Sequence, residues 1–254
     1  MAPHARLVEV FSSIQGESEL VGYRQIFLRF FGCNLHCDYC DSPEAHRAAE
    51  GPAWCRVEHT PGSSDCDRLS NPLSPADVCD AVARLNTVPH HSVSLTGGEP
   101  LIHALFLEAL LPELRGLGLP VYLETNGTLP ESLERVLEWV DFIGMDVKLP
   151  SVAGTDAASL LPRHQAFLTV ARRRRVFVKI VVGAETPASE VDEAARMVAA
   201  VDRAIPLTLQ PVTPFGGVAR APAPAKLLEL QALALRFLET VRVIPQTHKM
   251  LNVR

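Results

Sequence analysis

Short apolar runs alternate with segments of helical periodicity along most of this chain. The runs are continuously apolar, which is typical of parallel strands covered by helices. They predict strands at Gln25–Phe30, His91–Thr96, Pro120–Glu124, Phe142–Val147, Val176–Val182, Leu207–Gln210 and Val241–Ile244. Helices are predicted from Ser74-Pro75, a favourable N-cap and N1 pair, and over Leu101–Gly116, Glu131–Trp139, Ala188–Arg203 and Lys226–Glu239. The pattern indicates an α/β protein built from βα units.

Six βα units predict a partial (β/α)6, TIM-like barrel that is open on one side and forms a single domain over residues 1–254. Active sites of such barrels form at the carboxyl ends of the strands. The segments that follow predicted strands are the cysteine loop after Phe30, Thr96–Glu99, Glu124–Asn126, Asp146–Lys148 and Gln210. We expect them to share one site.

The segment from Ser42 to Leu73 lacks clear periodicity and is rich in proline, glycine, serine and charge. It carries Cys55 and Cys66. A loop of this length in a compact domain is usually functional or disordered. We interpret residues 42–73 as a surface insertion loop, with a second metal site or a lid as alternatives.

Three cysteines, Cys33, Cys37 and Cys40, lie in one short loop with the spacing C-x3-C-x2-C. Three thiolates can each bind one iron of a [4Fe–4S] cluster, which leaves one iron open to a small molecule. Zinc is the alternative, with His36 as a fourth ligand or with Cys55 and Cys66 as a second pair. Spacing alone leaves both kinds of site open.

Composition narrows the class of protein. The chain is 47% hydrophobic and 21% charged with a net charge of −5, which argues against bulk nucleic-acid binding. No apolar run approaches the roughly 18 residues of a membrane span, and the start does not resemble a signal peptide. We therefore expect no membrane association and a cytoplasmic location, where six cysteines point to metal or chemistry rather than disulfides.

The cysteine loop resembles that of the radical S-adenosylmethionine (radical SAM) superfamily. Thr96-Gly-Gly-Glu-Pro100 is similar to the superfamily's GGEP segment, and the two motifs together favour the cluster over zinc. Paired glycines allow close backbone approach, and Glu99 offers charge to an ammonium group. The resemblance implies that methionine chelates the open iron and that an electron from the cluster yields a 5′-deoxyadenosyl radical.

Two further segments narrow the resemblance to the 7-carboxy-7-deazaguanine synthase family of queuosine and other 7-deazapurine biosynthesis. They are Phe11-Ser-Ser-Ile-Gln-Gly-Glu17 with Arg29, and the end of the chain, Ile244–Arg254, with Gln246-Thr-His-Lys249. The resemblance covers nearly the whole chain apart from the insertion. It implies a carbon–nitrogen lyase that converts 6-carboxy-5,6,7,8-tetrahydropterin to 7-carboxy-7-deazaguanine and ammonia, with catalytic S-adenosylmethionine and Mg²⁺. It also implies a flavodoxin- or ferredoxin-like electron donor and a homodimer.

The resemblance implies a role for each matching residue. It implies no catalytic residue, because the cofactors carry out the chemistry. Cluster ligands are Cys33, Cys37 and Cys40. Substrate contacts are Ile14, Gln15, Gly16, Glu17, Arg29, Thr96, His248 and the terminal carboxylate of Arg254, of which Glu17, Arg29 and His248 position the pterin. S-adenosylmethionine contacts are Gly98, Glu99, Glu124, Asn126, Asp146, Val147, Lys148 and Gln210. Ser42 stands where the family usually has a threonine ligand for Mg²⁺, and its hydroxyl is a hard oxygen donor.

The chain departs from the family pattern at Ser18, which replaces a glycine, and at Asp146-Val147-Lys148, which replaces a Ser-Pro-Lys-like segment. Two other functions fit the cysteine loop. One is a radical SAM activating enzyme that installs a glycyl radical on a partner protein, against which the two terminal motifs argue. The other is a zinc-binding interaction module without enzymatic activity.

Overall fold

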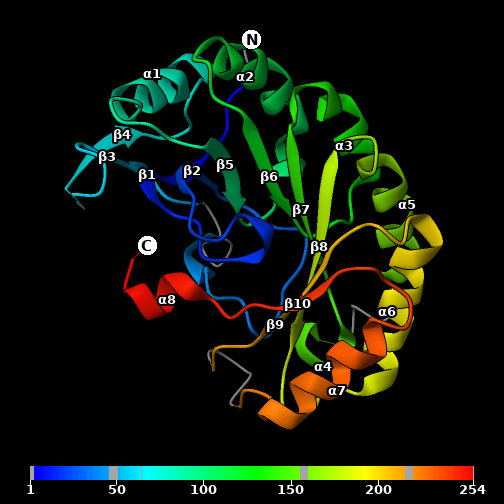
Figure 1. Cartoon of the computed structure of the whole chain (residues 1–254). Helices are drawn as coiled ribbons and strands as arrows, with labels where there is room; N and C mark the ends of the chain where they lie inside the picture. The colour runs from blue at the N-terminus through cyan, green and yellow to red at the C-terminus, as the bar shows by residue number, and fades with distance from the viewer. Residues whose placement is uncertain (1–2, 46–50, 64, 155–159, 215–219, 254) are drawn as a thin grey trace.

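The chain folds around one sheet whose strands curve into an incomplete barrel (Figure 1). The structure is a computed structural model and describes residues 3–45, 51–63, 65–154, 160–214 and 220–253. The strands are β1 (Leu7–Ile14), β2 (Arg24–Phe30), β3 (Trp54–Glu58), β4 (Cys66–Ser70), β5 (Ser92–Gly97), β6 (Val121–Thr125), β7 (Phe142–Val147), β8 (Arg175–Val182), β9 (Leu207–Pro211) and β10 (Val241–Val243). All seven predicted strands are confirmed, with small shifts at their ends.

The ten strands follow the order β10-β9-β8-β7-β6-β5-β2-β1-β3-β4. From β2 through β5 to β10 every neighbouring pair is parallel, whereas β1 runs antiparallel to β2. Within the described part of the chain no pairing joins β10 to β4, so the barrel stays open. The predicted partial barrel is confirmed.

Helices cover the outer face of the parallel strands (Figure 1). Those on the outer face are α1 (Pro75–Leu85), α2 (Ala104–Gly116), α3 (Pro130–Val136), α5 (Leu161–Ala171), α6 (Ala188–Val201) and α7 (Pro224–Ala234). The chain also has the short helices α4 (Pro150–Ala153) and α8 (Thr247–Leu251) and the single 3₁₀ turns η1 (Ser18–Leu20), η2 (Pro43–Ala45), η3 (Pro100–His103) and η4 (Leu137–Trp139). As predicted, Ser74 is the N-cap of α1, and its hydroxyl accepts from the backbone N–H of Asp77 in a capping box. No described helix is long and apolar enough to cross a lipid bilayer.

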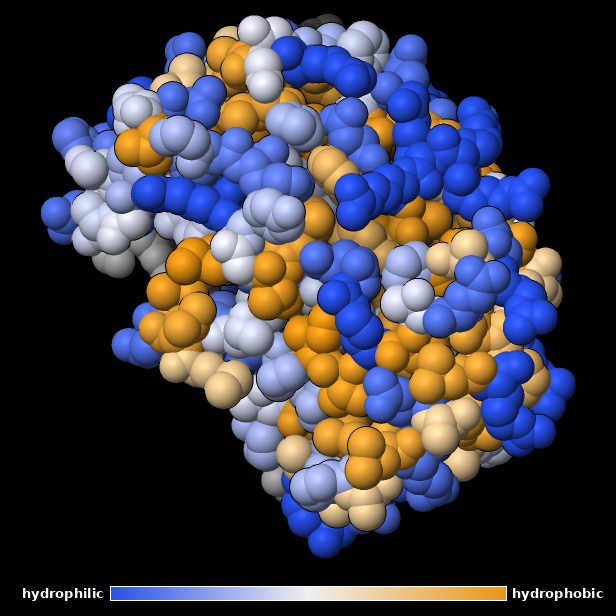
Figure 2. Space-filling view, viewed as in Figure 1, coloured by the Kyte–Doolittle hydropathy of each residue, from blue (hydrophilic) through white to orange (hydrophobic). Residues whose placement is uncertain are grey.

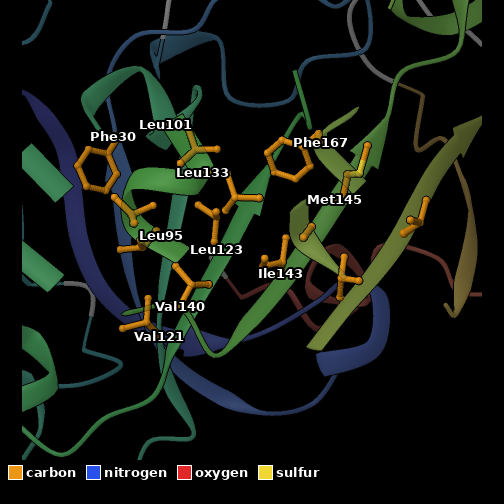
Figure 3. Close-up of a cluster of buried hydrophobic side chains, with 14 of the residues drawn as sticks. Phe30, Leu95, Leu101, Val121, Leu123, Leu133, Val140, Ile143, Met145 and Phe167 are labelled. Carbon is orange, nitrogen blue, oxygen red and sulfur yellow. The ribbon is translucent and has the colours of Figure 1, made fainter. Parts of the chain in front are cut away.

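The core lies between the strands and these helices. Figure 3 shows strand side chains such as Leu95, Leu123 and Ile143 packed towards Leu133 and Phe167 from α3 and α5. All five are fully buried. Burial of one such side chain stabilises the fold by about 1.5–3 kcal/mol, so this layer holds the strand ends in fixed positions.

The segment 42–73 differs from the predicted surface loop. Its described part contains β3, which pairs parallel with β1, and β4, which pairs antiparallel with β3. The hairpin therefore extends the sheet. Exposed Trp54 and Arg56 alternate with buried Cys55 and Val57, which is a half-buried strand pattern that the flanking proline and glycine residues obscure. Strand β1 and helix α5 were also absent from the sequence prediction.

Candidate active site

A cavity of about 330 Å³ opens at the carboxyl ends of the barrel strands. Of the predicted site residues it is lined by Ile14, Gln15, Gly16, Glu17, Arg29, Cys33, Cys37, Cys40, Ser42, Thr96, Gly98, Glu124, Asn126, Asp146, Lys148, Gln210 and His248. Glu99 and Val147 are not among the lining residues, and Arg254 lies outside the described residues. One cavity thus brings together segments from both ends of the chain.

The three cysteines of the loop are half-buried and all line this cavity. Burial is the main cause that raises the pKa of each thiol. Among the described residues, three metal-binding atoms lie within 4.8 Å of one another only at Glu17, Asp41 and His248. The three sulfurs are thus not gathered within 4.8 Å of one another, as they would be around a single zinc ion.

Close backbone packing joins the Gly97-Gly98 turn to the base of the cysteine loop. A Cβ on Gly98 would lie 1.9 Å from the carbonyl oxygen of Gly32, and Gly97 has a φ of +121°. The backbone N–H of Glu99 donates to the same Gly32 carbonyl at 2.8 Å. Only glycine fits at these positions, so the turn fixes where the loop starts.

Glu99 accepts hydrogen bonds from two neighbouring segments of the chain. Its carboxylate is fully buried and accepts from the backbone N–H of Asn126 at 2.7 Å, the Thr125 hydroxyl at 2.9 Å and the backbone N–H of Leu101 at 3.0 Å. Burial raises the pKa of Glu99 to about 7. Its carboxylate thus ties η3 to the end of β6, and its contact with the ammonium group of S-adenosylmethionine stays a prediction.

The side chain of Asn126 fastens the cysteine loop to the same strand end. Its Nδ2 donates to Asn34 Oδ1 at 2.8 Å, and Asn34 Nδ2 donates to the Thr128 hydroxyl at 2.9 Å. Asn126 Oδ1 in turn accepts from Thr128. Asn34 stands next to Cys33 and was missed by the sequence analysis, because an asparagine in a loop carries no pattern of its own.

The floor of the cavity is a hydrogen-bonded group around Glu124. Gln15 Nε2 donates to Glu124 Oε1 at 2.6 Å, and the Thr96 hydroxyl donates to Glu124 Oε2 at 2.9 Å. Burial and the nearby Glu17 carboxylate raise the pKa of Glu124. Glu124, which was predicted to contact S-adenosylmethionine, therefore bonds to two residues that were predicted to contact the substrate.

A chain of buried charges runs along one wall. Lys179 pairs with Glu17 and lies 3.3 Å from Asp146, and Asp146 also accepts from Lys148 at 2.9 Å. Lys148 donates to the Tyr39 hydroxyl at 2.8 Å. Burial opposes the charge on Glu17, but Lys179 and the Gln246 amide outweigh it and lower the pKa of Glu17 to about 2. Glu17 thus stays ionised.

Lys179 and Tyr39 were absent from the predicted site. Lys179 is the one charged residue of strand β8 after the exposed Arg175 that begins it, and a charged residue in the buried part of a strand usually points to a polar interior. That signal was available in the sequence. Tyr39 lies between two of the cysteines, and the motif formed by the cysteines does not specify the residue at that position.

Part of the Arg29 guanidinium forms hydrogen bonds with other residues of the protein. Its Nε donates to Glu9 Oε1 at 2.9 Å, and its Nη1 donates to the Ser42 hydroxyl at 3.1 Å. Glu9 also pairs with Arg56 of β3 at 2.9 Å. The inserted hairpin therefore supports the wall that holds Arg29 and Ser42.

The segment before and within α8 closes one side of the cavity. Gln246 Nε2 donates to Glu17 Oε1 at 2.7 Å and to Asp41 Oδ2 at 2.9 Å. The backbone N–H of Thr247 donates to the Gly16 carbonyl at 2.9 Å. A Cβ on Gly16 would lie 2.2 Å from the ring of His248, so glycine is required there. The two terminal motifs are thus in direct contact.

Two remaining predicted residues lie on the barrel strands. Gln210, on β9, is 2% exposed and lines the cavity, and among the described residues its Oε1 has no hydrogen-bond partner. That oxygen is free to accept from a bound molecule. The Val147 side chain packs in the core instead, so only its backbone could contribute.

Comparison with known proteins agrees with this geometry. Residues 28–165 match the Radical SAM superfamily, so the chain belongs to that superfamily of enzymes. Over 253 residues it is 48% identical to the 7-carboxy-7-deazaguanine synthase of Geobacter sulfurreducens, with 98% of each chain covered. It is 36% identical to the synthase of Thermococcus kodakarensis, with 97% of this chain and 98% of the relative covered. The chain belongs to the 7-carboxy-7-deazaguanine synthase family.

A solved structure shares the fold. The crystal structure of QueE from Escherichia coli has a TM-score of 0.60 at 20% identity, covering 96% of this chain and 94% of the other. At this identity the likeness concerns the arrangement of strands and helices.

Proposed function

We propose that this protein converts 6-carboxy-5,6,7,8-tetrahydropterin to 7-carboxy-7-deazaguanine with loss of ammonia, as a radical SAM lyase. The observation that carries the proposal is the single cavity in which the cysteine loop faces both the Gln15-Gly16-Glu17 turn and the Gln246–His248 segment. Relatives that match over nearly the whole length carry the same name. No observation favours a glycyl-radical activating enzyme or a zinc module.

The residues present fit the cofactors of such a reaction. Cys33, Cys37 and Cys40 would hold the [4Fe–4S] cluster, with Gly98, Lys148 and Gln210 nearby for S-adenosylmethionine. When bound, these cofactors supply the radical that removes a hydrogen atom from the substrate. The free Gln210 oxygen is an acceptor without a partner, which is the kind of atom a bound ligand completes.

The protein's own contribution is to bind and orient the pterin. Glu17, kept ionised by Lys179, would accept from N–H groups of the pyrimidine edge, while Thr96 and Glu124 lie opposite on the floor. The part of the Arg29 guanidinium that lines the cavity would meet the substrate carboxylate. His248 and the Thr247–Gly16 contact would exclude water from this side.

Mg²⁺ would lie beside Ser42, whose hydroxyl lines the cavity next to Asp41. These are hard oxygen donors of the kind that Mg²⁺ prefers, and the ion would neutralise the substrate carboxylate. Ser42 accepts one hydrogen bond from Arg29, which leaves the second lone pair of its hydroxyl oxygen for the ion. The proposal also includes a flavodoxin- or ferredoxin-like electron donor, a homodimer and a cytoplasmic location.

The test is an anaerobic assay of reconstituted protein with S-adenosylmethionine, Mg²⁺, a reductant and the tetrahydropterin, with products identified by mass. We expect 7-carboxy-7-deazaguanine to accumulate. Cleavage of S-adenosylmethionine without that product would leave the radical SAM assignment in place and overturn the substrate.

A further inference from the structure

The interior of the barrel is arranged in layers, whereas hydrophilic and hydrophobic residues lie side by side on the surface that Figure 2 shows. One interior layer is a small buried cluster. Its members are Leu20, Tyr122 and Phe177, with Phe142 packed against them. Glu124 is the second residue after Tyr122 on β6, and Lys179 is the second residue after Phe177 on β8. Since every second side chain of a strand points to the same face, these charged groups form the next layer towards the carboxyl ends of the strands.

Tyr122 brings a hydroxyl group into the apolar layer. The residue is 2% exposed and lines the active-site cavity, and its ring centroid lies 5.7 Å from that of Phe177. Its hydroxyl forms no hydrogen bond with any other residue that the structure describes. A buried tyrosine hydroxyl usually has a partner, so this one is open to a molecule bound in the cavity.

Gly144 makes room for this hydroxyl. It lies in the middle of β7 between buried Ile143 and Met145, where a glycine weakens a strand and often marks a close approach. A Cβ on Gly144 would lie 2.3 Å from the Tyr122 hydroxyl oxygen, whereas the φ of Gly144 does not itself call for glycine. Gly144 also lines the cavity, so the space that it leaves holds the hydroxyl at the cavity floor.

The surroundings of the hydroxyl make it a neutral donor. Burial is the main cause that raises the pKa of Tyr122 well above its ordinary value, and three nearby carboxylates add to it. They are those of Glu124, Glu17 and Asp146. The phenol therefore keeps its proton. Lys179, the charged donor of the same wall, is engaged by two of these carboxylates.

We propose that the Tyr122 hydroxyl donates a hydrogen bond to the ring carbonyl of the bound pterin, and that Gly144 positions it for this contact. The inference rests on the proposed function, from which it takes the substrate. The pyrimidine ring of the pterin carries N–H groups beside a carbonyl. Glu17 would accept from the N–H groups, but a carboxylate repels a carbonyl oxygen, so the carbonyl needs a separate donor.

The first test measures the affinity for 6-carboxypterin, an oxidised analogue that keeps the ring carbonyl but has no hydrogen at C6 to lose. Reconstituted protein with S-adenosylmethionine and Mg²⁺ is used in anaerobic equilibrium dialysis. We expect Tyr122→Phe to raise the dissociation constant about tenfold. Tyr23→Phe, which removes the same group from an exposed side chain outside the cavity, should leave the constant unchanged.

The stability of Tyr122→Phe separates a binding role from a packing role. The change removes no hydrogen bond between described residues, so the free energy of unfolding should not fall. A variant that is less stable but binds 6-carboxypterin normally would show that the hydroxyl serves the fold, and would overturn the inference.

A second ligand identifies the atom that the hydroxyl contacts. In 2-aminopteridine-6-carboxylate the ring carbonyl is replaced by hydrogen. The unaltered protein should prefer 6-carboxypterin over this analogue, and the preference should shrink about tenfold in Tyr122→Phe, because the variant can no longer contact the carbonyl. The same preference in both proteins would contradict the contact with the carbonyl.

Gly144→Ala tests the positioning role, because its Cβ would displace the hydroxyl. We expect it to weaken binding of 6-carboxypterin at least as much as Tyr122→Phe does. Adding Tyr122→Phe to Gly144→Ala removes the closest atom, so the double variant should regain stability without regaining affinity. Normal affinity in Gly144→Ala would show that Gly144 has no such role.

The outcomes distinguish this inference from the function on which it rests. Failure of the unaltered protein to bind 6-carboxypterin would contradict the proposed substrate. Equal affinity of the unaltered protein and Tyr122→Phe would leave that substrate in place and overturn the role of Tyr122 alone.

Discussion

At the residue scale, the cavity depends on buried charges that compensate one another. Glu17, Lys179, Asp146 and Lys148 form a continuous chain of alternating sign. Each charge would cost several kcal/mol if it were buried alone, and removal of one partner leaves another uncompensated. The polar wall is therefore expected to respond strongly to single substitutions.

Lys179→Met should weaken binding of the pterin. Without the ammonium group, burial and Asp146 disfavour the charge on Glu17, which then takes up a proton and loses its value as an acceptor. We expect the KM for the tetrahydropterin to rise at least about tenfold, with iron content unchanged. Lys226→Met, which removes only a surface lysine near Glu229, is the matched control. Equal KM values in both variants would contradict the role given to Lys179.

Glu99→Gln should lower the stability of the protein even before any cofactor binds. Both oxygens of Glu99 accept hydrogen bonds, so the amide group of glutamine would place a donor against a donor. We expect a loss of about 1–3 kcal/mol in the free energy of unfolding, measured by denaturant titration of the apoprotein. If stability is unchanged but S-adenosylmethionine affinity falls, Glu99 acts on the ligand after all.

His164 predicts a specific pH dependence of stability. It is fully buried on α5, its Nε2 lies 3.2 Å from the Asn126 carbonyl, and burial lowers its pKa to about 4 from an ordinary value of 6.5. Between these two values the unfolded chain binds a proton that the folded protein does not. Stability should therefore fall as the pH drops from 6.5 to 4, by up to about 3 kcal/mol from this group.

His164→Gln keeps a donor for the Asn126 carbonyl but cannot titrate. Urea unfolding at a series of pH values should show a smaller loss of stability for this variant than for the unaltered protein over that range. Parallel pH curves for the two proteins would show that His164 is not the titrating group.

At the element scale, strands were easier to predict than the contacts between them. A buried parallel strand is a continuous apolar run, and its carboxyl end locates the site, so the positions of Thr96, Asp146 and Gln210 followed from sequence. Strand β1 contains Glu9 and Ser12, and the β3–β4 hairpin lies among loop residues, so both lacked that signal. The links from Asn34 to Asn126 and from Lys179 to Glu17 join residues far apart in the chain, and no local pattern encodes them.

The two cysteines of the hairpin should have no part in metal binding. Cys55 pairs with Leu69 and Cys66 pairs with Glu58, three residues further along β3, so the two thiols lie on opposite faces of the hairpin. Cys55→Ser and Cys66→Ser should retain the iron content of the unaltered protein, whereas Cys37→Ser should lose most of it. Cys55→Ser should also lower the free energy of unfolding by about 1–3 kcal/mol, because the serine hydroxyl would be buried without a well-placed hydrogen-bond partner. Loss of iron in either hairpin variant would revive the second metal site.

At the scale of the whole molecule, the two ends of the chain meet over one cavity. Gln246 and Thr247 bond to Glu17 and Gly16, so the last helix closes a site that the first strand begins. Periodicity predicts the barrel but gives no reason for this meeting. Both terminal motifs match one family, and the resemblance assigned both to the same substrate. The resemblance, rather than any local pattern, therefore indicated that the two ends of the chain would meet.

The most direct test of the account is a count of product formed per S-adenosylmethionine consumed, with substrate deuterated at C6. If the cavity holds the pterin for a ring contraction in which hydrogen is returned, many molecules of 7-carboxy-7-deazaguanine should form for each S-adenosylmethionine lost, and deuterium should enter the recovered S-adenosylmethionine. Stoichiometric loss of S-adenosylmethionine to 5′-deoxyadenosine, without deuterium transfer or deazaguanine product, would contradict the proposed function.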